Sequence, residues 1–141
     1  MDKQHTFHRS DLVRIAIDAM KERGLEPEFP PRALQQLQTI EAAGQDDDPR
    51  IRDLTALPWC SIDNDDSLDL DQLTACGTLG NGAVKIFVAV ADVDVLVKKN
   101  SAIDQHAHTN TTSVYTSARV FPMLPERLST DLTSLNPGEE R

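Results

Sequence analysis

The feature that most constrains the fold is an apolar run at residues 84–93, in which β-branched side chains predominate. Such a run predicts a β-strand, and we expect it to be buried on both faces because polar residues do not alternate regularly with apolar ones. The dipeptide Asn81-Gly82 precedes it and is typical of a hairpin turn. Shorter apolar segments at 59–62 and 68–73 predict two more strands, the second of which the turn joins to the long run.

The first 45 residues show helical periodicity instead. Ser10 is a suitable N-cap, and apolar residues follow at helical spacing as far as Gly24. Pro31 opens a second amphipathic pattern that ends near Gly44. We therefore expect two helices that pack together as an N-terminal helical hairpin.

The charge of the chain is concentrated in one region. The 141 residues contain 14 Lys and Arg against 23 Asp and Glu, a formal net charge of −9. Nine aspartates and two arginines lie between positions 46 and 71, so this window carries −7 of the total. The acidic surplus argues against a nonspecific polyanion binder, which needs excess Lys and Arg to neutralise phosphates.

These patterns predict an α+β fold in three segments. Residues 1–45 form the helical region, residues 46–53 an acidic linker, and residues 54–141 the strands followed by a helix over 102–110 that Ser101 caps. No apolar run approaches the roughly 18 residues of a membrane span, and the polar start resembles no signal peptide. We expect no membrane partner, a cytoplasmic location and reduced, structural cysteines.

Five aspartates lie within nine positions in the string Ser-Ile-Asp-Asn-Asp-Asp-Ser-Leu-Asp-Leu-Asp-Gln, which starts at Ser61. On a strand Asp69 and Asp71 would face the same side, and a tight loop could fold Asp63 back toward them. Converging carboxylates form a hard oxygen site suited to Mg²⁺ or Mn²⁺. Such ions hold phosphate oxygens and promote displacement at phosphorus.

Two other interpretations of this cluster stay open on spacing alone. A run of charge is commonly a solvated acidic turn with no ligand. Asp69-Leu70-Asp71 also resembles the nucleophile motif of aspartate-based phosphatases, although Gln72 does not continue that motif. An EF-hand is excluded, because its glycine and glutamate positions are occupied by Leu68 and Thr74.

The chain resembles the catalytic domain of the ribonuclease II / ribonuclease R (RNB) family. Three blocks carry the resemblance: residues 54–73 with the aspartate string, residues 88–97 reading Val-Ala-Val-Ala-Asp-Val-Asp-Val-Leu-Val, and residues 112–141 with Pro-Met-Leu-Pro-Glu-Arg-Leu-Ser and Ser-Leu-Asn-Pro-Gly. They cover about the last two thirds of the chain in the order found in the family. The resemblance implies that the chain is the N-terminal part of a truncated RNB catalytic domain.

The resemblance also implies an activity and a set of residues. The complete protein is expected to be a 3′–5′ exoribonuclease that hydrolyses single-stranded RNA to nucleoside monophosphates with Mg²⁺, or alternatively Mn²⁺. Asp63, Asp69 and Asp71 match three of the four active-site aspartates of the family, and Gln72 takes the position of the fourth. A neutral amide in that position holds a divalent ion more weakly than a carboxylate.

Two residues of the third block match RNA-contacting positions. Tyr115 matches the aromatic residue that stacks on the RNA end in the family, and Arg127 is a candidate phosphate contact. The complete protein is expected to be monomeric. The alternative is a catalytically impaired or truncated RNA-binding remnant of the same family, because Gln72 and the missing remainder of the domain both weaken the metal site.

Overall fold

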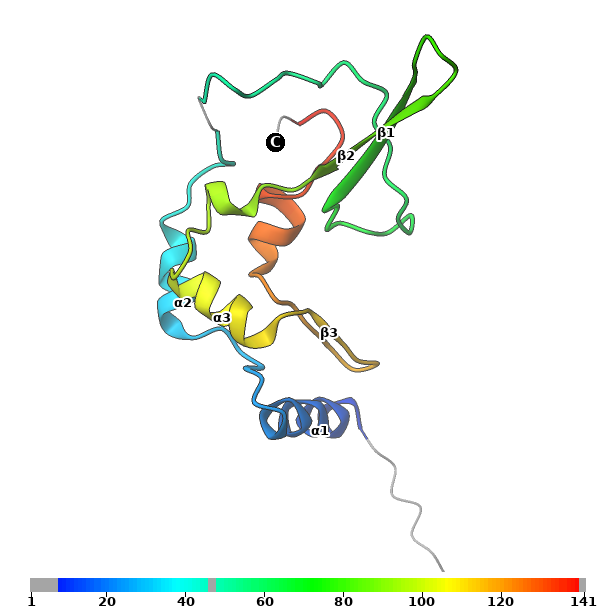
Figure 1. Cartoon of the computed structure of the whole chain (residues 1–141). Helices are drawn as coiled ribbons and strands as arrows, with labels where there is room; N and C mark the ends of the chain where they lie inside the picture. Colours follow the sequence, from blue (N-terminus) through cyan, green and yellow to red (C-terminus); the bar gives the residue numbers. More distant parts are fainter. Residues whose placement is uncertain (1–7, 46–47, 140–141) are drawn as a thin grey trace, which may run out of the picture. The chain divides into compact units, whose positions relative to one another are not determined.

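A computed structural model describes residues 8–45 and 48–139 of the chain. Its elements, shown in Figure 1, are helices α1 (Arg9–Glu22), α2 (Pro31–Gln38) and α3 (Ala102–Asn110), strands β1 (Gln72–Thr78), β2 (Val84–Val90), β3 (Val114–Tyr115) and β4 (Val120–Phe121), the 3₁₀ turn η1 (Val93–Val95) and the π-helix η2 (Leu128–Leu132). The predicted α+β class is confirmed. None of the helices in the described parts of the chain is long and apolar enough to cross a bilayer.

The chain divides into two compact units. The first comprises the residues up to Thr39 together with Asn100–Pro125, and the second comprises Ile40–Lys99 together with the residues from Glu126 onward. This division follows contacts within the chain, and the segments predicted at 1–45, 46–53 and 54–141 stay a prediction. Parts of that scheme, including Asp46 and Asp47 of the acidic linker, lie outside the described residues.

Helix α1 begins earlier than predicted. Its N-cap is His8, whose backbone N–H donates to the Asp11 carboxylate at 3.0 Å, whereas Ser10 lies inside the helix. The Asp11 carboxylate thus satisfies the N–H of the N-cap residue, which favours a helix start at this position. The helix ends close to Gly24, which has a φ of 74° as expected of a glycine at a helix end.

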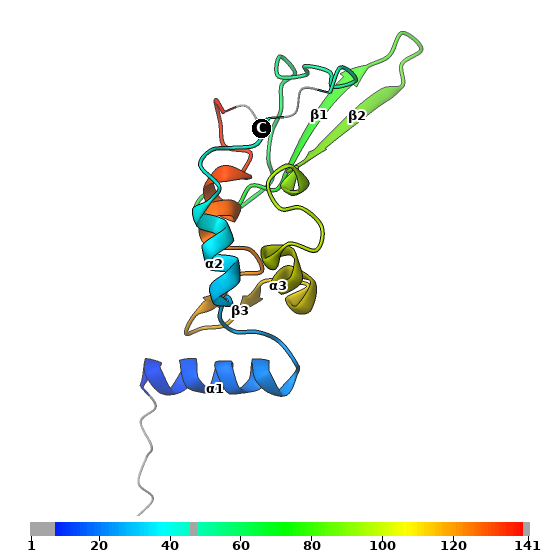
Figure 2. The same cartoon turned by 90° about the vertical axis from the view of Figure 1, so that its left-hand side faces the viewer.

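The predicted helical hairpin is wrong in its packing, because α2 packs against α3 and makes no packing contact with α1 among the described residues. Ala33 of α2 and Ile103 of α3 are fully buried. The side-chain oxygen of Gln36 accepts a hydrogen bond from the Ile103 N–H at 3.0 Å, so it satisfies an amide of the first turn of α3. Helix α3 has the predicted bounds, and the Ser101 hydroxyl caps it by accepting from the Asp104 N–H. Figure 2 shows α2 and α3 side by side.

Strands β1 and β2 form an antiparallel hairpin at the predicted turn, with Gln72 opposite Val90 and Thr78 opposite Val84. The Leu79 N–H donates to the Ala83 carbonyl at 2.7 Å and closes the loop, in which Gly82 has a φ of 82°. The segment predicted as a strand at 59–62 makes only an isolated bridge between Cys60 and Thr74. The segment at 68–73 is irregular until β1 begins, because the backbone groups of Leu68 and Leu70 pair with Ser134 and Leu135, outside the sheet.

The expectation that the long apolar run is buried on both faces is also wrong. The side chains of β2 that alternate on one face are 59–69% exposed: Val84, Ile86, Val88 and Val90. On the other face Phe87 packs edge-on against Trp59, with ring centroids 6.4 Å apart. Strand β2 is therefore exposed on one face, and only Phe87 and Ala89 are partly covered on the other.

Candidate functional site

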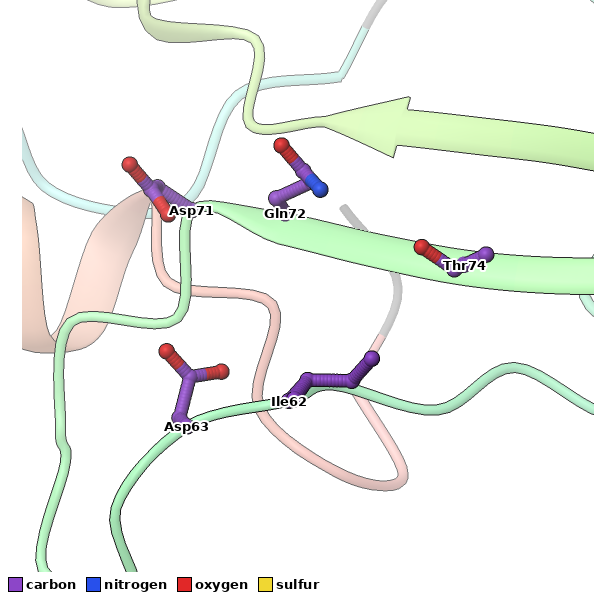
Figure 3. Close-up of a pocket in the computed structure, with 5 residues that line it drawn as sticks. All are labelled: Ile62, Asp63, Asp71, Gln72 and Thr74. Carbon is purple, nitrogen blue, oxygen red and sulfur yellow. The ribbon is translucent and has the colours of Figure 1, made fainter.

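The candidate site is a pocket of about 220 Å³ at the start of β1, in the second unit. Figure 3 shows its lining residues, which are Ile62, Asp63, Asp71, Gln72 and Thr74. The side chain of Asp63 points from its own segment toward the segment that carries Asp71 and Gln72. The pocket therefore combines two carboxylates, an amide and a hydroxyl with one apolar wall.

The bridge between Cys60 and Thr74 explains why these side chains meet. The two residues exchange both backbone hydrogen bonds, at 2.9 and 2.8 Å, so the chain before Asp63 runs antiparallel to β1. Asp63 lies three residues after Cys60, and Asp71 lies three residues before Thr74. The antiparallel register therefore brings together two carboxylates that lie eight positions apart in the sequence.

The backbone on the other side of Asp71 is held by β2. The Ala91 N–H donates to the Asp71 carbonyl at 2.9 Å and extends the hairpin ladder by one pair beyond Gln72 and Val90. Gln72 and Thr74 project to the same face of β1 because they are two residues apart. Both side chains line the pocket.

The structure brings together three of the four predicted metal ligands. Asp63, Asp71 and Gln72 line the pocket, whereas Asp69 is exposed and does not line it. Within the described ranges, no group of three or more His, Cys, Asp and Glu side chains lies close enough to hold a metal ion. The choice of Asp63, Asp69 and Asp71 as catalytic residues stays a prediction.

The donor set nevertheless suits a hard cation. Two carboxylates and one amide supply only oxygen ligands, and Mg²⁺ is commonly held by one or two carboxylates while it keeps several waters and binds substrate phosphate. Asp63, Asp71 and Gln72 therefore fit Mg²⁺ or Mn²⁺. Ile62 and Thr74 were not predicted as site residues, although Thr74 follows Gln72 at the two-residue spacing of one strand face.

The acidic residues nearer the linker have local partners. The Arg50 guanidinium donates to the Asp48 carboxylate and lowers the pKa of that carboxyl. The hydroxyl and N–H of Thr55 both donate to Asp53, with the same effect on its pKa. Asp48 and Asp53 therefore have partners two residues away in the sequence, and neither lines the pocket.

Tyr115 lies on the short hairpin of β3 and β4 in the first unit, where it pairs with Val120 and is 70% exposed. Phe121, on the other face of this hairpin, is 1% exposed and anchors it. Arg119 donates two hydrogen bonds to Glu28, at 2.6 and 3.0 Å, and these hold the pKa of the Glu28 carboxyl below its usual value. The hairpin thus presents an accessible aromatic ring from an anchored base.

Arg127 lies directly before η2 in the second unit and is exposed. One of its terminal nitrogens, Nη2, donates to the Glu41 carbonyl at 3.3 Å. The guanidinium therefore has a neutral backbone partner, and its positive charge is not compensated by that contact. The proposed roles of Tyr115 and Arg127 in RNA binding stay predictions.

Residues 51–141, which include the residues of the acidic pocket, match the family described as the RNB domain. The chain belongs to the RNB domain family, which confirms the resemblance found in the sequence. It is 43% identical over 89 residues to Ribonuclease R of Vibrio cholerae serotype O1, a match that covers 63% of this chain and 11% of the relative. Ribonuclease R of Acidithiobacillus ferrooxidans is 39% identical over 135 residues, or 95% of this chain and 30% of the relative.

Two solved structures are similar in fold to most of this chain. They are Mycoplasma genitalium RNase R in complex with double-stranded RNA and the same protein in complex with ribose methylated single-stranded RNA, with TM-scores of 0.76 and 0.75. Their identities to this chain are 34% and 33%, and the match covers 91% of this chain in both cases. It covers only 23% and 20% of those chains, so this chain spans less than a third of its relatives.

Proposed function

We propose that the complete protein containing these residues is a 3′–5′ exoribonuclease that hydrolyses single-stranded RNA to nucleoside monophosphates. Membership of the RNB domain family and the relatives named Ribonuclease R support this activity. RNA as the partner is supported by the solved RNase R structures, whose titles name RNA complexes. A cytoplasmic location and a monomeric state belong to the same proposal.

The observation that carries the proposal is the meeting of Asp63 and Asp71 in one pocket within the matched region. Their carboxylates and the amide oxygen of Gln72 would hold Mg²⁺, or Mn²⁺ in its place, with Asp69 available from the same loop. The chemistry that a bound divalent ion supplies is charge neutralisation at the phosphate and activation of water. Water adds to phosphorus as the bond to the 3′ oxygen of the preceding nucleotide breaks, which releases a nucleoside 5′-monophosphate.

Residues outside the pocket would bind the substrate. The exposed ring of Tyr115 offers a face on which the terminal base stacks, an interaction worth about 1–3 kcal/mol that does not discriminate between bases. Arg127 offers a guanidinium for a phosphate. An enzyme that degrades RNA stepwise must accept every base, and stacking with phosphate contacts meets this requirement.

Substitution of Asp71 tests the proposal. In the complete protein, Asp71→Asn is expected to reduce hydrolysis of a labelled single-stranded RNA at least about 100-fold, since it removes a charge that supports phosphate chemistry, while RNA affinity changes little. Asp66→Asn is the matched control, because Asp66 belongs to the same loop and does not line the pocket. Undiminished turnover by Asp71→Asn, or an equal loss in both variants, would contradict the proposed catalytic role.

A second candidate function is an RNA-binding remnant without catalysis. It is favoured by Gln72 and by the absence of a three-carboxylate group within the described residues. Calorimetric titration with Mg²⁺ separates the two functions. Stoichiometric binding near millimolar concentrations supports the enzyme, whereas RNA binding without it supports the remnant.

A further inference from the structure

Ser134 is a fully buried polar residue of the second unit. It lies against the loop of residues 63–71, called here the aspartate loop. Its hydroxyl accepts a hydrogen bond from the Leu70 N–H at 3.1 Å and donates one to the Leu68 carbonyl at 2.8 Å. The side-chain oxygen of Asn136 lies 3.2 Å from the same hydroxyl. Because a hydroxyl has a single proton, the shorter contact to Leu68 takes it, and Asn136 is a secondary partner.

The next residue completes this contact. The Leu135 N–H donates to the Leu70 carbonyl at 2.8 Å, so both backbone groups of Leu70 are bound by the 134–135 segment. Leu70 separates Asp69 from Asp71. Residues 134–135 therefore hold the backbone of a loop that has no regular secondary structure before β1.

These bonds constrain the peptide planes around both aspartates. The Leu68 carbonyl and the Leu70 N–H belong to the two peptide units that flank Asp69, and Ser134 binds both of them. The two peptide units that flank Asp71 are held by Leu135 and by Ala91. Since peptide units are planar, fixing the units on both sides of a residue fixes the direction of its Cα–Cβ bond.

Ser134 is itself held in place by the turn that follows η2. Its N–H donates to the Asp131 carbonyl at 3.2 Å, and the Thr133 N–H donates to the Leu128 carbonyl at 3.0 Å. Leu128 and Leu132 are buried and anchor the π-helix. The hydroxyl of Ser134 is therefore presented from a packed element.

We propose that Ser134 is a positioning residue. Its hydroxyl holds both peptide units that flank Asp69 and so sets the direction of Asp69, and together with the Leu135 amide it fixes Leu70, the residue that leads into Asp71. The inference rests on the proposed function, because it assigns Ser134 to the loop from which Asp71, with Asp69 available beside the pocket, would hold a divalent ion. Ser134 is fully buried and does not line the pocket. Its effect passes through the loop backbone alone.

The test compares Ser134→Ala with Thr133→Val in the complete protein. Thr133 is also a buried hydroxyl residue, but its Oγ1 donates to the Leu128 carbonyl of η2 and does not contact the aspartate loop. Mn²⁺ is the probe, and electron paramagnetic resonance measures its binding. The Mn²⁺ concentration that gives half-maximal RNA hydrolysis measures its effect on activity. Both variants are expected to lower the melting temperature.

Only Ser134→Ala is expected to weaken Mn²⁺ binding, by about 10-fold. This is the lower end of the loss of affinity that follows when a residue orienting a metal ligand is removed. Thr133→Val is expected to leave the Mn²⁺ affinity within about 2-fold, because it alters no bond of the loop. The Leu70 amide should also lose hydrogen-exchange protection only in Ser134→Ala. Equal changes of Mn²⁺ affinity in the two variants, or none in Ser134→Ala, would overturn the inference.

Two further results of these experiments also decide the inference. If Ser134→Ala does not fold, Ser134→Cys keeps a similar side-chain volume with weaker hydrogen bonds, and it should weaken Mn²⁺ binding to a smaller extent; an unchanged affinity overturns the positioning role. If the wild-type protein neither binds Mn²⁺ nor hydrolyses RNA, the proposed function itself fails. That failure is seen before any variant is compared, and it removes the positioning role with it.

Discussion

Gln72 is the residue at which this chain departs from the four aspartates expected of its family. It is the first residue of β1 and lines the pocket beside Asp71. An amide oxygen can accept a contact from a cation, but it contributes no negative charge to the site. Gln72 therefore lines the pocket without adding to the charge of its two carboxylates.

A single substitution should restore that charge. We expect Gln72→Asp to raise the affinity for Mn²⁺ about 10-fold, which corresponds to about 1.4 kcal/mol, because a third carboxylate would join Asp63 and Asp71. Isothermal titration calorimetry measures the change. Asn64→Asp is the control: it adds the same charge to the same loop outside the pocket, and an equal gain there would show that only net charge matters.

At the scale of elements, the β1–β2 hairpin is the framework of the site. Its register sets Gln72 and Thr74 at the pocket, and the Ala91 N–H holds the backbone of Asp71. The turn at one end of this ladder thus determines which residues meet at the other end. A change of register by one residue would turn Gln72 and Thr74 to the opposite face.

The turn itself can be tested at Gly82, which has a φ of 82°. We expect Gly82→Ala to destabilise the chain by about 1–2 kcal/mol, because a side chain disfavours the left-handed region. Gly80→Ala is the matched control: an added Cβ meets nothing within 4 Å at either glycine, and Gly80 has no positive φ of this kind. Thermal unfolding compares the two, and equal losses of stability would argue against the turn geometry.

At the scale of the whole molecule, the exposed face of β2 distinguishes this chain from a closed domain. Val84, Ile86, Val88 and Val90 present β-branched side chains to solvent along one strand. The same residues would be expected in a core on their composition alone. The contribution of these side chains to the free energy of unfolding therefore depends on what surrounds the strand, and residue type alone does not determine it.

Exposure can be measured through stability in the 141-residue chain. We expect Val88→Thr to change the free energy of unfolding by less than about 0.5 kcal/mol, because Val88 is 59% exposed. Leu128→Ala, at a side chain that is 0% exposed, is expected to cost about 2–5 kcal/mol. Denaturant titration gives both values, and a cost for Val88→Thr near that of Leu128→Ala would mean that the face is buried in solution.

Local chemistry was sufficient to predict several elements. Ser101 supplies a hydroxyl cap and Asn81-Gly82 a turn, so α3 and the hairpin appear where the sequence places them. These features act over a few residues and are encoded by side chains next to the backbone groups they satisfy. The match of residues 51–141 to the RNB domain likewise follows from motifs that are contiguous in the chain.

Contacts between distant segments decided the rest. The sequence alone determined the acidic string, the hairpin turn and the family, because each depends on neighbouring residues. Only the tertiary structure placed α2 against α3, exposed one face of β2, joined Asp63 to Asp71 but left Asp69 outside the pocket, and bound the loop backbone to Ser134. The physical reason is that burial and hydrogen-bond partners belong to pairs of segments up to 109 positions apart among the described residues, and no local pattern specifies which segments pair.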